Sequence, residues 1–292
     1  MTRIKAGIID VFAESALSGN PLAVVEGADA LTDATMRLIS REFNQAETTF
    51  LLRSDVADWR LRSFTASGAE VFGAGHNSLG AWLWLAAEGK LGTLETAQTF
   101  QQEIGNAVLP ITLERRSGVY FGLMKQSPLK LLASLDNLRP LAEALGLNVV
   151  DINPVPDPRV ADTGANHLLV RLVDKGAVDR ARVSAELLLP VLHAVGAEGC
   201  YIYFYESGHA YARFFNPAVG LWEDAATGTA AGPLCAYLGA MGFLGPDRTL
   251  LVEQGVLMGR RSLLNVRLTP DAELSGTGVV VFRGELLLVP SE

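Results

Sequence analysis

The sequence reads EVFGAGHNSLGAWLWLAAEGKLG at positions 70–92 and EDAATGTAAGPLCAYLGAMGFLG at positions 223–245. Both segments begin with small residues, continue as an apolar stretch of helical length and end on Gly-x-Leu-Gly. A single offset of 153 residues superimposes six identities in matching context, which indicates an internal duplication rather than a short-period solenoid. The matching pairs are Glu70 and Glu223, Gly75 and Gly228, Leu85 and Leu238, Gly89 and Gly242, Leu91 and Leu244, and Gly92 and Gly245.

Outside these two segments, strand-like patterns dominate both halves. A helix is expected from Thr32, which suits an N-cap, and the two apolar segments predict central helices over 79–87 and 229–241. Because strands outnumber helices, we predict an α+β fold of two pseudo-symmetric domains, each a barrel-like mixed β-sheet wrapped around a central α-helix. The expected strands are 8–12, 22–25, 48–52, 59–64, 108–113 and 119–123 in the first half, and 167–173, 201–205, 212–215, 249–252 and 263–268 in the second.

The predicted domain boundaries follow from this arrangement. The first domain is expected to comprise residues 1–117 together with a C-terminal strand at 279–292, and the second to comprise residues 118–278. The stretch 151–157 combines prolines, asparagine and acidic residues, and it is expected to be a connecting loop.

The composition argues against several classes of function. Net charge is −8 and no block of Lys or Arg occurs, so a nucleic-acid partner is not expected. Apolar runs are too short for a membrane span, and the N-terminus lacks the pattern of a signal peptide. Two cysteines, Cys200 and Cys235, are too few for a disulfide framework and are expected to be buried thiols. The expected protein is soluble and cytoplasmic.

The starts of both central helices carry a candidate anion site. Positions 73–78 and 225–230 are rich in Gly, Ala, Ser and Thr. The first N–H groups of a helix have no intrahelical partner, and the helix dipole favours an anion there. Two such helix ends, facing each other across a cleft, would hold a small carboxylate. The alternative is that the small residues only permit close packing of helix on sheet.

Three acid–base residues stand near these segments. Glu47 lies between a predicted helix and an apolar strand, where partial desolvation would raise its pKa and suit it to proton transfer. Position alone favours the other interpretation, an ordinary surface glutamate at a helix end. His76 lies at the presumed N-terminus of the first central helix, as either a catalytic or a structural histidine. Asp224 precedes the second, either as its N-cap or as a substrate contact.

No cofactor or metal is expected. The four histidines and two cysteines lack metal-ligand spacing. The sequence also lacks a Walker motif, a Gly-x-Ser-x-Gly elbow and a dinucleotide-binding Gly-x-Gly-x-x-Gly after a strand.

Taken in order, the motifs of the chain resemble those of the PhzF-like phenazine-biosynthesis family, within the diaminopimelate-epimerase-like fold. They cover nearly the whole chain, and together they are specific. They are Asp10-x-Phe12 with Gly19-Asn20-Pro21, Asn44-Gln45-Ala46-Glu47-Thr48-Thr49-Phe50, Arg62-x-Phe64-Thr65, Glu70-Val71, Gly75-His76, Arg213-x-Phe215-x-Pro217, Glu223-Asp224-x-Ala226-Thr227-Gly228-Thr229-Ala230 and Gln254-Gly255-x-x-Met258-Gly259-Arg260.

The resemblance implies a cofactor-free isomerase with its active site between two domains. It also implies a homodimer. In the phenazine-pathway member, the glutamate that matches Glu47 moves a proton on a cyclohexadiene carboxylate, dihydro-hydroxyanthranilate. His76 and Asp224 match residues that bind and orient that substrate. The remaining matching positions are assigned to substrate binding: Asn20, Gly75, Gly228 and Thr229.

The chain departs from the family pattern beside these residues. Asn77 stands where the family often has Ala, and we expect it to bring an amide to the substrate. Thr229 stands where the family often has Ser, so its extra methyl would crowd a small ligand. The substrate therefore need not be the phenazine precursor.

Two other functions stay open on the sequence alone. One is a binding protein that kept the fold and lost turnover. The other is an epimerase with a catalytic pair of cysteines, which is disfavoured because Cys200 and Cys235 lie outside the helix-start motifs.

Overall fold

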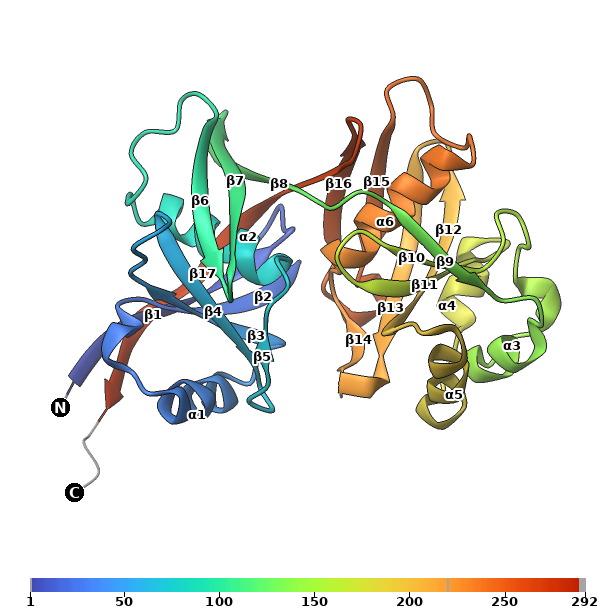
Figure 1. The fold of residues 1–292 in the computed structure, drawn as a ribbon, viewed down its shortest axis with the longest axis horizontal. Coiled ribbons are helices and arrows are strands. Elements are labelled where there is room, and N and C mark those ends of the chain that lie inside the picture. Colours follow the sequence, from blue (N-terminus) through green and yellow to red (C-terminus); the bar gives the residue numbers. More distant parts are fainter. Residues whose placement is uncertain (1, 220, 289–292) are drawn as a thin grey trace. The chain divides into compact units, whose positions relative to one another are not determined.

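The computed structural model describes residues 2–219 and 221–288 and divides the chain into two compact units (Figure 1). Unit 1 comprises Met1–Met124 and Ser275–Glu292, and unit 2 comprises Lys125–Leu274. The chain thus crosses between units after Met124 and after Leu274, where the sequence predicted crossings after 117 and after 278. The reason is strand pairing: the strand over Val119–Lys125 pairs with the preceding strand and so belongs to unit 1.

Unit 1 is a closed barrel. Its strands pair in the order β17–β1–β2–β3–β4–β6–β7–β8, and β8 pairs back with β17. Closure leaves no sheet edge in the barrel, with the two-residue β5 added beside β4. The elements are β1 (Thr2–Val11), β2 (Asn20–Val25), η1 (Ala28–Ala30), α1 (Asp33–Phe43), β3 (Glu47–Leu52), β4 (Trp59–Thr65), β5 (Glu70–Val71), α2 (His76–Ala87), β6 (Gln98–Ile104), β7 (Ala107–Arg116), β8 (Val119–Lys125) and β17 (Ala272–Leu288).

Unit 2 repeats this strand order and adds a layer of helices. Its sheet runs β9–β10–β11–β12–β13–β15–β16, with β14 beside β13. The helices α3, α4 and α5 contribute to one apolar cluster with strands β10 to β13. The elements are β9 (Lys130–Ser134), α3 (Arg139–Leu145), η2 (Val149–Asp151), β10 (Arg159–Asp162), β11 (Asn166–Arg171), α4 (Lys175–Arg180), α5 (Ala185–Val195), β12 (Gly199–Glu206), β13 (His209–Asn216), η3 (Pro217–Val219), β14 (Leu221–Asp224), α6 (Gly228–Ala240), β15 (Thr249–Gln254), η4 (Val256–Met258) and β16 (Ser262–Leu268).

The predicted duplication is visible in the topology. Both units place two parallel pairs at equivalent points, β2–β3 and β4–β6 in unit 1, and β11–β12 and β13–β15 in unit 2. In both units the central helix follows a short strand, β5 or β14. It then leads into the second strand of the second parallel pair, β6 or β15. The predicted α+β class with a pseudo-symmetric pair of domains is therefore confirmed.

Each central helix forms the core of its own unit. In α2 every residue from His76 to Ala86 is buried, and α6 is buried over nearly its whole length. A helix that is apolar all round requires this surrounding sheet. Packing is close enough to demand glycine: a Cβ on Gly80 would lie 2.6 Å from a methyl carbon of Val11. The helices begin at His76 and Gly228, earlier than the expected 79 and 229.

The shared glutamates Glu70 and Glu223 have equivalent roles. Each accepts two hydrogen bonds from one arginine of the neighbouring strand, Arg62 at 2.7 and 2.9 Å and Arg213 at 2.9 and 2.9 Å. Bidentate pairs of this kind fix both position and orientation. They tie β5 to β4 and β14 to β13, directly before the loops that lead into the central helices.

The remaining local predictions concern α1 and membrane helices. Thr32 is the N-cap of α1, as predicted, and its hydroxyl accepts from the Thr35 N–H at 3.2 Å. Within residues 2–219 and 221–288, no helix combines the length and apolar character needed to cross a membrane.

Candidate active site

Glu47 occupies the first position of β3. Helix α1 ends at Phe43, and Asn44 takes a left-handed conformation that turns the chain toward the sheet. Asn residues tolerate this conformation better than most. Glu47 then pairs with Leu22 on β2 and Thr65 on β4. Its side chain is 18% exposed, although the Oε2 atom itself is buried.

His76 lies beside Glu47 at the start of α2. Its Nδ1 is 3.8 Å from Glu47 Oε2. Burial lowers the pKa of His76 to about 4, so the ring is neutral at pH 7. The pair is therefore not a charged ion pair at that pH, and 3.8 Å is longer than a hydrogen bond. Among the described residues, the buried Nε2 of His76 has no hydrogen-bond partner.

Asn20 lies at the same end of the unit 1 barrel. It begins β2, which runs parallel to β3, and its register places it two residues before the partner of Glu47. The side chain is 2% exposed. The structure therefore brings Asn20, Glu47 and His76 to one end of one barrel, although the sequence spreads them over 57 positions.

The Asn77 side chain has a different role from the one expected. Its Oδ1 accepts from the Gly75 N–H at 2.8 Å, and its Nδ2 donates to the Gly73 carbonyl at 3.0 Å and to Ser63 Oγ at 3.1 Å. The amide is buried and its hydrogen bonds go to the protein. Asn77 thus shapes the loop before α2 rather than presenting an amide to a ligand.

That loop leads into the first turn of α2. Gly75 is the residue before the helix, and no side chain caps the N–H groups of the first turn. The N–H groups of a first turn have no intrahelical partner, so they can bind an anion. The buried, unpartnered His76 Nε2 at the same helix end is a second polar group available to a ligand.

Asp224 anchors the corresponding loop of unit 2. It ends β14, and its Oδ2 accepts from the Thr227 hydroxyl at 2.6 Å. The N-cap position belongs to Thr227, so the N-cap interpretation of Asp224 is wrong. The strand continues through Asp224, and three residues separate it from the helix. Asp224 therefore fixes the loop through a side-chain bond.

Gln254 is a residue that sequence reasoning missed. Its Nε2 donates to the Asp224 carbonyl at 2.7 Å and to Thr227 Oγ1 at 3.0 Å. Its Oε1 accepts from the Tyr201 hydroxyl at 2.9 Å and from the Thr227 N–H at 3.2 Å. Fully buried, Gln254 saturates its amide by holding this loop in place. The Gln-Gly motif at 254 was the available signal, but its partners lie far away in sequence.

Gly228 and Thr229 form the first turn of α6. The Gly228 carbonyl accepts from Gln126 Nε2 at 2.9 Å. The Thr229 hydroxyl lies 3.1 Å from His167 Nε2, on β11. His167 was predicted only as part of a strand, so its contact with the helix start is new.

The two cysteines are not placed for catalysis. Cys200 lies on β12 and Cys235 in the middle of α6, and both are buried free thiols. Burial raises the pKa of each thiol to about 12, so neither is a thiolate at neutral pH. A proton-transferring thiol pair would need the opposite environment.

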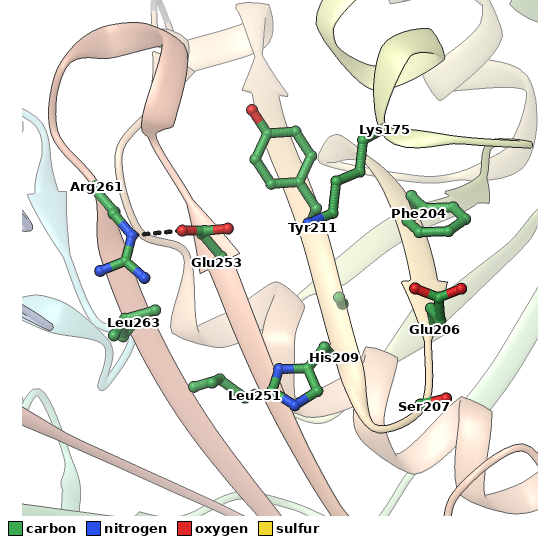
Figure 2. Close-up of a pocket in the computed structure, with 11 residues that line it drawn as sticks. Lys175, Phe204, Glu206, Ser207, His209, Tyr211, Leu251, Glu253, Arg261 and Leu263 are labelled. Carbon is green, nitrogen blue, oxygen red and sulfur yellow. Dashed lines mark hydrogen bonds and ion pairs between the residues drawn. The ribbon is translucent and has the colours of Figure 1, made fainter.

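A pocket of about 440 Å³ lies elsewhere, on the sheet of unit 2 beside α4 (Figure 2). It contains none of the predicted site residues. Its polar groups are largely paired with each other: Arg261 with Glu253, and the Lys175 ammonium 5.5 Å from the ring of Tyr211. Over the described part of the chain, no cluster of three or more His, Cys, Asp or Glu side chains could hold a metal ion.

Comparison with known proteins identifies the family. The family model described as phenazine biosynthesis-like protein, PhzC-PhzF, matches residues 9–284. The chain belongs to this family. The predicted family resemblance is thereby confirmed, and the residues that carried it span the matched region.

Relatives of the family share both its length and its fold. Trans-2,3-dihydro-3-hydroxyanthranilate isomerase from Pseudomonas chlororaphis is 32% identical over 289 residues, covering 96% of this chain and 98% of the relative. A PhzF-family phenazine biosynthesis protein from Bacillus anthracis matches with a TM-score of 0.90 at 28% identity, over 99% and 100% of the two chains. A predicted epimerase from Pseudomonas aeruginosa matches with a TM-score of 0.84 at 32% identity, over 98% and 100%. The chain is an isomerase of the PhzC-PhzF family with the epimerase-like fold.

Proposed function

We propose that this isomerase moves a proton between two carbons of a small, unsaturated cyclic carboxylate without a cofactor. Glu47 takes the proton from one carbon as its carboxylate and returns it to another as the carboxylic acid. One group can serve as base and then as acid when both carbons lie on the same face of the substrate.

The observation that carries this proposal is the pairing of Glu47 with a neutral His76. The 3.8 Å separation of Nδ1 and Oε2 leaves the carboxyl group close to the imidazole without a permanent ion pair. A charged histidine would hold Glu47 as the carboxylate and resist its protonation. Because burial keeps His76 uncharged, the carboxyl group can alternate between its two forms. We assign His76 to binding and orienting the substrate through the ring.

The carboxylate of the substrate is assigned to the helix starts. The first turns of α2 and α6 present N–H groups without intrahelical partners, at His76 and at Gly228-Thr229. This binding needs no basic side chain, in keeping with a chain of net charge −8. Asp224 is proposed to orient a polar substituent of the substrate, and Asn20 is proposed as a further substrate-binding residue.

The choice of substrate class follows from the relative from Pseudomonas chlororaphis. The substrate in the name of that relative, trans-2,3-dihydro-3-hydroxyanthranilate, is a cyclic, unsaturated carboxylate. Because the two chains are 32% identical, and because Thr229 and Asn77 replace the usual residues of the family, we propose cyclic, unsaturated carboxylates as the substrate class rather than that compound.

The test compares Glu47→Gln with Glu42→Gln, an exposed glutamate on α1 that serves as the matched control. Turnover is measured on trans-2,3-dihydro-3-hydroxyanthranilate and a panel of cyclic unsaturated carboxylates. Loss of a general acid–base group lowers kcat by about 100- to 10,000-fold. We expect that loss for Glu47→Gln with ligand binding preserved, and wild-type turnover for the control. Full turnover by Glu47→Gln would overturn the proposal.

A homodimer and a cytoplasmic location are further proposals; the first rests on the family resemblance and the second on the composition and cysteine usage of the sequence. Light scattering on the purified chain tests the first: a mass of twice 31.2 kDa supports it, and a mass of 31.2 kDa contradicts it.

A further inference from the structure

The side chain of His167 contacts the helix start that is assigned to the substrate carboxylate. His167 is 3% exposed, on β11, and its Nε2 lies 3.1 Å from the Thr229 hydroxyl in the first turn of α6. This is the hydrogen bond that the structure gives to Thr229 Oγ1. Among the described residues, the other ring nitrogen, Nδ1, is buried without a partner.

The unpartnered Nδ1 determines which nitrogen carries the proton. A neutral imidazole has one N–H donor and one acceptor nitrogen. A buried N–H without an acceptor is costly and rare, whereas an acceptor without a donor is tolerated more often. The proton therefore belongs on Nε2, and Nδ1 is the bare acceptor. Burial keeps the ring in this neutral form by lowering its pKa to about 4.

The direction of the hydrogen bond follows. Nε2–H donates to Thr229 Oγ1, so the hydroxyl proton of Thr229 is not used by His167. A hydroxyl has one proton to donate, and it can turn to a second acceptor. An anion bound beside the N–H groups of the first turn would supply that acceptor.

We propose that His167 is a positioning residue that fixes the Thr229 hydroxyl as a hydrogen-bond donor to the carboxylate of the ligand. The assignment of a carboxylate to this helix start rests on the proposed function. What is added is a residue on strand β11 that sets the affinity for the anion through Thr229.

A purely structural role for His167 is the alternative to be tested. Its ring packs edge-on against Phe214, with centroids 4.8 Å apart. His167→Phe preserves an aromatic ring for this contact and removes the donor. Thr229→Val preserves the shape of Thr229 and removes the hydroxyl. His193→Phe, at an exposed position on α5, is the matched control.

Binding of anthranilate, an aromatic carboxylate, is measured by calorimetry for each variant and for the double variant. A hydrogen bond to a charged group corresponds to a loss of about 10- to 100-fold in affinity when it is removed. We expect that loss for Thr229→Val, a smaller one for His167→Phe, and no further loss in the double variant relative to Thr229→Val. Additive losses would show that His167 acts independently of Thr229 and would overturn the proposal.

The tautomer of His167 provides a second readout that needs no activity. Nitrogen-15 NMR of the folded protein, assigned by comparison with His167→Phe, distinguishes the two neutral forms. We expect a protonated Nε2, and a protonated Nδ1 would overturn the proposal. Failure of the proposed proton transfer would appear instead in the turnover of Glu47→Gln, so the two failures are separable.

Discussion

Acidification from pH 7 to pH 5 is expected to destabilise the protein through two buried histidines, one in each unit. Burial lowers the pKa of both His76 and His167 to about 4. The usual value in an unfolded chain is about 6.5. Between these values the unfolded state binds protons that the folded state does not, so stability rises with pH across this interval and falls on acidification.

The size of the effect follows from the two pKa values. The full difference of about 2.5 units corresponds to about 3 kcal/mol per histidine, and about 2 kcal/mol of it is lost between pH 7 and pH 5. Together, His76 and His167 should therefore reduce the free energy of unfolding by about 4 kcal/mol over this range. For a protein whose stability is of the usual order, about 5–15 kcal/mol, that is a large fraction.

The assay is urea unfolding at pH 7 and pH 5 for the wild type, His76→Asn and His167→Phe. Carboxylates also titrate as the pH falls, but they are common to all three proteins. The loss of unfolding free energy between pH 7 and pH 5 is therefore compared between wild type and each variant. The wild type should lose about 2 kcal/mol more than either variant, which is the contribution of the histidine that the variant lacks. Equal losses in all three proteins would refute the reasoning, because the histidines would then titrate alike in the folded and unfolded states.

Two further predictions concern the thiols and the buried ion pair. Cys200→Ala and Cys235→Ala should keep wild-type turnover, because both thiols are buried and protonated; loss of turnover in a folded variant would revive the thiol-based epimerase. Arg213→Ala should destabilise the protein by about 3–5 kcal/mol in thermal or urea unfolding, because it leaves Glu223 buried without its partner. Removing both charges with apolar residues should cost less, and a larger loss in that double variant would contradict the explanation.

Much of the fold could be predicted from the sequence because it depends on local patterns. The apolar, small-residue segments at 70–92 and 223–245 contain the central helices, as their length and apolar character indicated. The offset of 153 residues corresponds to a repeated topology. Exact ends were harder to predict, because the helix starts depend on loops whose hydrogen bonds come partly from remote residues, such as the bonds of Gln254 to Asp224 and Thr227.

The candidate site was predictable in its residue types and not in its contacts. Glu47 and His76 could each be singled out, but their 3.8 Å approach depends on how β3 and α2 meet in the barrel. His167 and Gln254 lie on strands remote in sequence from the loop and helix that they contact. His167 carries no local pattern that distinguishes it from an ordinary strand residue, and the Gln254-Gly255 motif does not reveal which loop Gln254 contacts. Pairing of distant strands determines these contacts, and motif spacing does not encode it.

The role of Glu47 in proton transfer is tested most directly by NMR in deuterated water. Wild type, Glu47→Gln and Glu42→Gln are each incubated with trans-2,3-dihydro-3-hydroxyanthranilate and related cyclic carboxylates. We predict that deuterium enters the ring carbon that receives the proton with wild type and Glu42→Gln, and does not enter with Glu47→Gln. Incorporation by Glu47→Gln at the wild-type rate would contradict the proposal that Glu47 carries the proton.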